Sequence, residues 1–176
     1  MVQPSECETA QRLELPLLVR EFGLPVPRSC DDQEERELGQ NGAVHDWLQR
    51  FERHLHRFID EVMTARYGPD WPRGQLPNGL YQQWMGRKQA DRLFGRDLPL
   101  IDYADFMDYE RVICRGDNWK LFRRYFVREH NVREAFLHLH GPRNAVMHAR
   151  SLSKVDELLA FAEIKRLSFQ MVSTLH

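Results

Sequence analysis

The segment VHDWLQRFERHLHRFIDEVMTARY, residues 44–67, decides the fold class. Its large apolar side chains recur three, four and seven residues apart, the spacing that places them on one face of an α-helix. They are Val44, Trp47, Leu48, Phe51, Leu55, Phe58, Ile59 and Val62. Gly68-Pro69 follows and is typical of a helix end. The segment therefore predicts a long amphipathic helix with one buried face.

Apolar patterns of the same kind predict further helices along the chain. We expect them at about 80–94, 102–114, 119–128 and 131–140, with Gly116-Asp117-Asn118 as a stop and an N-cap before the third of these. Gly141-Pro142 is expected to interrupt the next helix, whose pattern resumes through residue 147 or 148. A last helix opens with a capping box at Ser153–Asp156, and its apolar residues are Val155, Leu158, Leu159, Ala162 and Leu167. No segment alternates convincingly as a strand would, so the predicted class is all-α.

The first 42 residues differ from the rest. Four prolines punctuate them, residues 31–37 are acidic, and Gln40-Asn41-Gly42 is a turn signal. We therefore predict an extended or partly ordered N-terminal arm over 1–42 and one helical domain over 43–176.

Composition places the chain among ordinary globular proteins. The 176 residues are 42% hydrophobic and 29% charged, enough for one domain with a core of its own. The three cysteines, Cys7, Cys30 and Cys114, form no metal-binding or redox pair and are expected to be free thiols. No secretion signal and no apolar run of membrane-spanning length is apparent. We expect a cytoplasmic protein that does not associate with a membrane.

Charge is unevenly distributed along the chain. Residues 1–40 hold nine acidic residues and four arginines, a balance of −5, whereas residues 111–133 hold seven basic and two acidic residues, a balance of +5. Such asymmetry indicates a partner that carries phosphates, or contact between the two segments. The alternative is a solvated helix face.

One hexapeptide carries candidate chemistry: Arg143-Asn144-Ala145-Val146-Met147-His148. An arginine followed five positions later by a histidine is a weak pattern, and Arg133 and His138 show it too. In the second match, however, Asn144 follows the arginine and lies four residues before the histidine, on the same helix face. Pro142 is typical of the first turn of a helix, where free backbone amides favour an anion such as phosphate.

With this motif ahead of a short loop and one last amphipathic helix, the chain resembles the HEPN superfamily, the higher eukaryotes and prokaryotes nucleotide-binding domains. The likeness covers about 51–169 and is greatest to the branch found in a nuclear mRNA-surveillance endonuclease and in bacterial defence proteins. Besides the motif, it rests on Phe58-Ile59 with Tyr67-Gly68-Pro69-Asp70-Trp71, on Asp105-Phe106-Met107-Asp108 and on Asn118-Trp119-Lys120-Leu121-Phe122.

The resemblance implies a helical bundle, a homodimer formed through the motif helices, and RNA cleavage in a shared cleft without metal or other cofactor. It also implies a role in defence or stress, toxin-like, with a neutralising antitoxin protein as a partner. The superfamily includes inactive, structural copies. Toxins silenced by modification of a tyrosine carry it two residues after the motif histidine, and this chain has Arg150 there.

The residue types suit such a reaction. Cleavage by attack of the 2′-hydroxyl needs a base, an acid for the leaving 5′-oxygen and positive charge beside the phosphorane; imidazole and guanidinium supply these. We expect His148 to be the base or acid and Arg143 to stabilise the transition state. Asn144 is expected to position the phosphate or His148. A second protomer would supply the other member of the acid–base pair. The RNA backbone is expected on Lys120, Arg123, Arg124, Arg128 and Arg150.

Other polar clusters do not predict a metal site. His54 and His56, like His138 and His140, are two residues apart and point about 200° away from each other on a helix. His138 and His140 are expected to be packing residues near the cleft, with His138 as an accessory substrate contact. Asp102, Asp105 and Asp108 are expected on the wet face of a helix, with Asp105 as a second accessory residue.

Two further functions fit the same residues. One is a non-catalytic helical dimer module that binds RNA, a nucleotide or a protein. The other is a protein-interaction module in which the acidic segment 31–37 and the arm engage a partner or cover the basic cleft.

Overall fold

The computed structural model describes residues 33–148 and 150–172, and all regular secondary structure within them is helical. The elements are α2 (Gln33–Tyr67), α3 (Pro72–Gln75), α4 (Leu80–Arg92), the 3-10 helix η1 (Leu100–Tyr103), α5 (Phe106–Ile113), α6 (Gly116–Phe122), α7 (Glu129–Met147) and α8 (Lys154–Val172). The predicted all-α class is confirmed for these residues. The first 32 residues of the predicted arm lie outside the described part of the chain.

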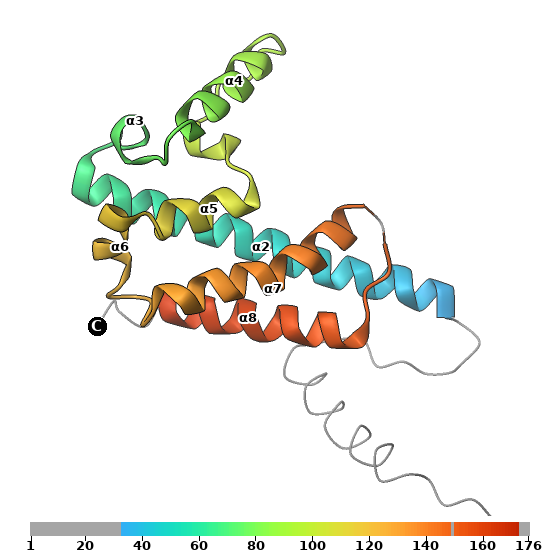
Figure 1. Cartoon of the computed structure of the whole chain (residues 1–176). Helices are drawn as coiled ribbons and strands as arrows, with labels where there is room; N and C mark the ends of the chain where they lie inside the picture. Colours follow the sequence, from blue (N-terminus) through green and yellow to red (C-terminus); the bar gives the residue numbers. More distant parts are fainter. Residues whose placement is uncertain (1–32, 149, 173–176) are drawn as a thin grey trace, which may run out of the picture.

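The body of the fold is a helical hairpin packed on the long helix α2. Helices α7 and α8 lie side by side and antiparallel, as Figure 1 shows, and Arg166 near the end of α8 donates to the Asn131 carbonyl near the start of α7 at 3.0 Å. Helices α5 and α6 pack against the same body, whereas α4 extends away from it and contacts mainly η1 (Figure 1). No helix among the described residues is long and apolar enough to cross a membrane.

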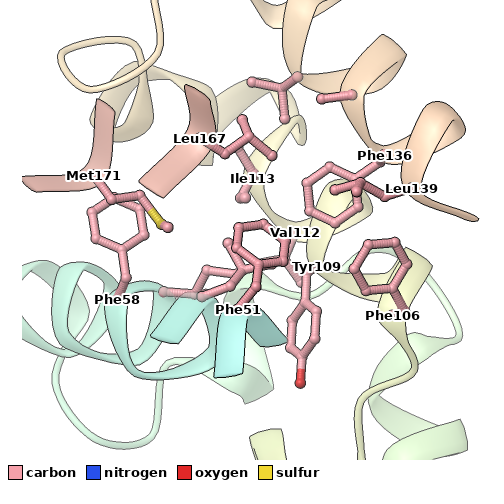
Figure 2. Packing of buried hydrophobic residues seen from close by; sticks show 14 of the residues in the cluster. Phe51, Phe58, Phe106, Tyr109, Val112, Ile113, Phe136, Leu139, Leu167 and Met171 are labelled. Carbon is pink, nitrogen blue, oxygen red and sulfur yellow. The ribbon is translucent and has the colours of Figure 1, made fainter. Parts of the chain in front are cut away.

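The predicted apolar face of α2 is confirmed as the centre of the core. Seven of its eight residues are buried, and the eighth, Trp47, is half-buried with its ring edge-on to Phe161 at 5.5 Å. Figure 2 shows Phe51 and Phe58 of α2 opposite side chains from α5, α7 and α8. Burial of large aromatic side chains is the main force that holds such a bundle together.

Helix α2 begins earlier than predicted. The turn expected at 40–42 does not form, because α2 starts at Gln33 and continues through Asn41 and Gly42. A glycine inside a helix costs about 1 kcal/mol relative to alanine. A helix of 35 residues that is anchored by its buried face can absorb such a cost.

Helix α6 also differs from the prediction. It starts at Gly116 and ends at Phe122, whereas a helix over 119–128 with a cap before it was expected. The reason lies in Asn118, which does not cap the helix. Its buried side-chain amide donates to the carbonyls of Gln75 (2.9 Å) and Val112 (2.8 Å), so α6 is tied to the end of α3 and to α5.

The interruption predicted at Gly141-Pro142 is wrong, since α7 is one helix that contains Pro142. Proline removes one backbone hydrogen bond and crowds the preceding turn. Here the Pro142 ring is buried, and α7 packs against α2, α5 and α8 along its length. These contacts offset the local cost, and the motif therefore lies at the C-terminal end of a continuous helix.

The buried face of α8 is rotated from the predicted one. Ser153 does cap the helix, since its Oγ accepts the Asp156 N–H at 3.1 Å. However, Val155 is 72% exposed and Leu159 36% exposed, although both were expected inside. The buried residues are Glu157, Ala160, Phe161, Ile164, Leu167 and Met171. Phe161 determines this face by packing against α2.

Cys114, at the end of α5, is a free thiol within the core. Burial, with a smaller effect of the nearby Glu110 carboxylate, raises its pKa to about 12. The native thiol therefore keeps its proton at a pH where the unfolded thiol has lost it. Stability from this group is fully present below the ordinary thiol pKa and is lost as pH rises toward 12.

We accordingly expect the free energy of unfolding to fall above about pH 9, by at most about 1.4 kcal/mol per pH unit from this group. Denaturant unfolding at several pH values checks it, with Cys114→Ala as the control that should show a shallower decline. Equal slopes for the two proteins would contradict the assignment. A thiol reagent should also label Cys114 only after unfolding, which a Cys7→Ser/Cys30→Ser background isolates.

Candidate functional site

Arg143 lies where α7 crosses α2. Its Nε donates to Oε1 of Glu52 at 3.2 Å, and both side chains are 27% exposed. The guanidinium is thus held between two helices by a carboxylate that lies 91 residues earlier in the chain. A planar guanidinium has five donors, so one bond to a carboxylate leaves others for a phosphate oxygen.

Asn144 and His148 belong to a different face of the helix. They continue a stripe of α7 that includes Leu137 and Gly141, at helical intervals of four, three and four residues. The Asn144 amide lies 3.0 Å from Nε2 of His140, which is one turn earlier. His148 is exposed, and its imidazole has no hydrogen-bond partner among the described residues.

The structure therefore pairs Asn144 with His140, places His148 one turn beyond Asn144 on the same side of α7, and turns Arg143 away from His148. Five residues of α-helix rotate the side chain by about 500°, which leaves Arg143 and His148 about 140° apart around the axis. One protomer presents the histidine outward and the arginine toward α2. A substrate that contacts both side chains of one protomer must therefore reach around α7 from one face to the other.

The predicted anion site made of free backbone amides is wrong, because the motif ends α7 and does not begin it. The His148 N–H is already used, with the carbonyls of Asn144 (3.1 Å) and Ala145 (3.2 Å) as its acceptors. The N–H of Arg150 donates to the Ala145 carbonyl at 2.8 Å. A helix C-terminus carries partial negative charge. Attraction for phosphate at this end must come from side chains.

A polar cluster that was not predicted from the sequence lies on α2 and α5, and one of its members, Glu52, binds Arg143. Gln49, Glu52, Arg53, His56 and Tyr109 line an open hollow of about 220 Å³. Nδ1 of His56 lies 3.4 Å from Oδ1 of Asp102, a separation suited to orienting the imidazole. The hollow thus combines carboxylate, imidazole, guanidinium and phenol groups.

Tyr109 contributes a phenol at the border of the core. Its ring is buried and its hydroxyl points away from the apolar side chains in Figure 2. Burial, followed by the Glu52 and Asp102 carboxylates, raises its pKa well above the ordinary value for tyrosine. Tyr109 therefore stays neutral at physiological pH and can donate a hydrogen bond into the hollow.

Three of the seven basic residues predicted to form a surface over 111–133 are paired with acidic side chains within the fold. Lys120 pairs with Asp117 at 2.8 Å, and Arg133 pairs with Glu129 at 2.8 Å. Arg111 lies 3.4 Å from the Asp108 carboxylate. The balance of +5 counted along the sequence is therefore too high by two, because buried Asp108 and Glu110, which lie just before this segment, pair with Arg111 and Arg133.

The remaining predicted RNA-binding residues lie away from the motif or in the loop after it. The Arg124 guanidinium stacks on the Tyr125 ring at 4.7 Å. Arg123 and Arg128 are exposed and have no partner among the described residues. Arg128 precedes α7, so about 22 Å of helix separates it from Arg143. Arg150 is exposed in the loop between α7 and α8.

Neither predicted accessory residue joins Arg143. His138 accepts or donates at 3.0 Å with Glu163 and so connects α7 to α8. Asp105 precedes α5, pairs with Arg87, and its N–H donates to Oδ2 of Asp108 at 2.9 Å.

The three aspartates expected on one wet helix face are distributed differently. Asp102 belongs to η1, Asp105 caps α5, and Asp108 is buried, with its Oδ2 accepting the Trp84 indole N–H at 2.9 Å. In the part of the chain that the structure describes, no three His, Cys, Asp or Glu side chains are arranged to hold a metal ion.

Comparisons of the chain with protein-family models, curated proteins and solved structures gave no match.

Proposed function

We propose that the chain is a metal-independent endoribonuclease of the HEPN type that acts as a homodimer in defence or stress. In this proposal His148 exchanges the proton of the 2′-hydroxyl or of the leaving 5′-oxygen, Arg143 binds the phosphate, and Asn144 positions the reacting groups. A toxin-like protein of this kind would be held in check by a neutralising protein.

The observation that carries the proposal is the exposed imidazole of His148 at the end of α7, one turn beyond the Asn144–His140 pair and without a hydrogen-bond partner among the described residues. A general acid or base must be open to substrate, whereas a structural histidine is usually bonded within the fold. His138 on the same helix is of the second kind, since Glu163 binds it. The contrast between the two histidines supports a chemical role for His148.

A dimer would resolve the separation of Arg143 from His148. Exposed apolar side chains flank the motif on the hairpin: Leu137 and Met147 on α7, and Val155 and Leu159 on α8. Exposed apolar side chains on a helical hairpin are suited to contact with a partner. A second copy that covers this face could bring its own His148 toward the first Arg143 and supply both an acid and a base.

The Glu52–Arg143 pair favours the alternative, a non-catalytic module in which the arginine stabilises the α2–α7 contact. Removing the Glu52 carboxylate distinguishes the ribonuclease from the non-catalytic module. If Arg143 binds phosphate, Glu52→Gln should tighten RNA binding about fivefold, because a carboxylate about 4 Å from a phosphate repels it by about 1 kcal/mol in water.

Fluorescence anisotropy with labelled RNA measures this effect, and Glu129→Gln is the matched control. Glu129 also pairs with an arginine, at 2.8 Å, but at the other end of α7. The control should leave affinity unchanged. If Glu52→Gln weakens binding as much as Arg143→Ala does, the pair is structural and the module is favoured over the enzyme.

Cleavage itself is tested by incubating the full chain with a structured RNA in EDTA and analysing the product ends. Products with 2′,3′-cyclic phosphate would support 2′-hydroxyl attack. Intact RNA after incubation with folded protein would contradict the proposal.

A further inference from the structure

Three arginines form a stripe on the exposed side of α2. Arg50, Arg53 and Arg57 are three and four residues apart, so they lie on one face over about 10 Å of helix. All three are exposed, and Arg50 and Arg57 have no partner among the described residues. Arg53 makes only a long contact, with the Gln49 carbonyl at 3.4 Å.

The stripe lines a hollow. Arg50, Arg53 and Arg57, together with His54, His56 and Asp102, enclose an open space of about 660 Å³. The two histidines lie on opposite sides of the stripe, as expected for residues about 200° apart on a helix. With neutral histidines the lining carries three positive charges and one negative charge. We call this space, with its six lining residues, the α2 groove.

The α2 groove continues into the hollow beside Arg143. Arg53 and His56 line both spaces, and Glu52, in the second one, binds Arg143. The arginines of the α2 groove therefore lead into the hollow in which the Glu52 carboxylate binds the motif arginine. This continuity distinguishes the α2 groove from the predicted basic residues at 120–128, which lie near the other end of α7.

We propose that the α2 groove binds the phosphodiester backbone of single-stranded RNA and directs it to Arg143. The inference rests on the proposed ribonuclease function and names the surface by which that site holds its substrate. Guanidinium groups bind phosphate oxygens through two parallel N–H donors, and a row of them follows a strand without reading its bases. The unpaired charge of Arg50 and Arg57 leaves those donors available.

The test compares two variants that remove the same charge. Arg50→Ala/Arg53→Ala/Arg57→Ala removes the stripe, and Lys120→Ala/Arg123→Ala/Arg128→Ala removes three of the five basic residues predicted from sequence to bind RNA. Both are made in a His148→Ala background so that bound RNA stays intact. Binding of a labelled oligouridine of about 15 nucleotides is measured by anisotropy at several salt concentrations, with circular dichroism as the check on folding.

For single strands, log K falls with log salt concentration by about 0.7 per neutralised phosphate. Loss of three contacts should therefore reduce the salt slope by about 2 and the affinity by about a hundredfold at roughly 0.1 M salt. The control triple variant should lose far less. An equal or larger loss in the control, or no loss in the stripe variant, would overturn the proposal and leave the groove to another occupant, such as an acidic protein segment.

Cleavage by the His148-containing protein is recorded in parallel. Cleavage without dependence of binding on the stripe would reject the α2 groove and keep the ribonuclease. Stripe-dependent binding without cleavage would keep the groove as an RNA-binding surface and reject the ribonuclease.

Discussion

Replacing His148 by alanine is expected to slow RNA cleavage by about 10²- to 10⁴-fold, the usual contribution of a positioned acid or base. The side chain is exposed and unbonded among the described residues, so the fold should lose less than about 0.5 kcal/mol. A large kinetic effect with unchanged stability is the signature of chemistry at this residue. The measurement is the rate of RNA cleavage in EDTA, with thermal unfolding recorded alongside.

His130→Ala is the matched control for this experiment. His130 is also an exposed histidine of α7, with its Nε2 at 3.0 Å from Glu134, and it lies at the opposite end of the helix. Cleavage should be unaffected by its removal. If both variants cleave at the wild-type rate, His148 has no chemical role and the acid or base must be sought elsewhere.

The largest effect on stability is expected for Phe136→Ala, a loss of about 3–5 kcal/mol in the free energy of unfolding. Phe136 is fully buried on α7, and its ring lies 5.0 Å from that of Phe106 on α5. Figure 2 shows it beside Leu139 and near Phe106. The truncation removes a whole aromatic ring and leaves a cavity that three helices would have to close.

Urea unfolding followed by circular dichroism measures the loss, and Phe94→Ala supplies the comparison. Phe94 is 79% exposed after α4, so its removal should change stability by less than about 0.5 kcal/mol. Similar losses in both variants would contradict the arrangement of α5 against α7.

The sequence pattern predicted the buried face of a helix correctly where apolar residues repeat on that face. The apolar face of α2 could be predicted because eight side chains agree on a single period. It failed where the decisive contact is distant in sequence. Phe161 sets the face of α8 by packing against α2, and the Asn118 amide binds carbonyls of α3 and α5 instead of capping α6.

The same distinction explains the candidate site. Arg143, Asn144 and His148 could be found as a local motif. Whether the motif begins or ends a helix, however, depends on whether Pro142 interrupts α7. Glu52 could not be assigned to Arg143 from sequence, because only the packing of α2 on α7 brings them together. The arginine stripe of α2, by contrast, was visible as helical spacing at 50, 53 and 57, and was missed because the charge count was made along the chain and not around the helix.

The pairing of Glu52 with Arg143 also determines when the site can exist during synthesis. The two residues are 91 positions apart, and chains grow at about 5–20 residues per second, so about 5–18 s pass between their appearances. Throughout that interval a ribosome carries α2 with its arginines but without the motif helix. For a protein proposed to cut RNA, this delay separates the growing chain, still attached to its own message, from the finished site that could attack it.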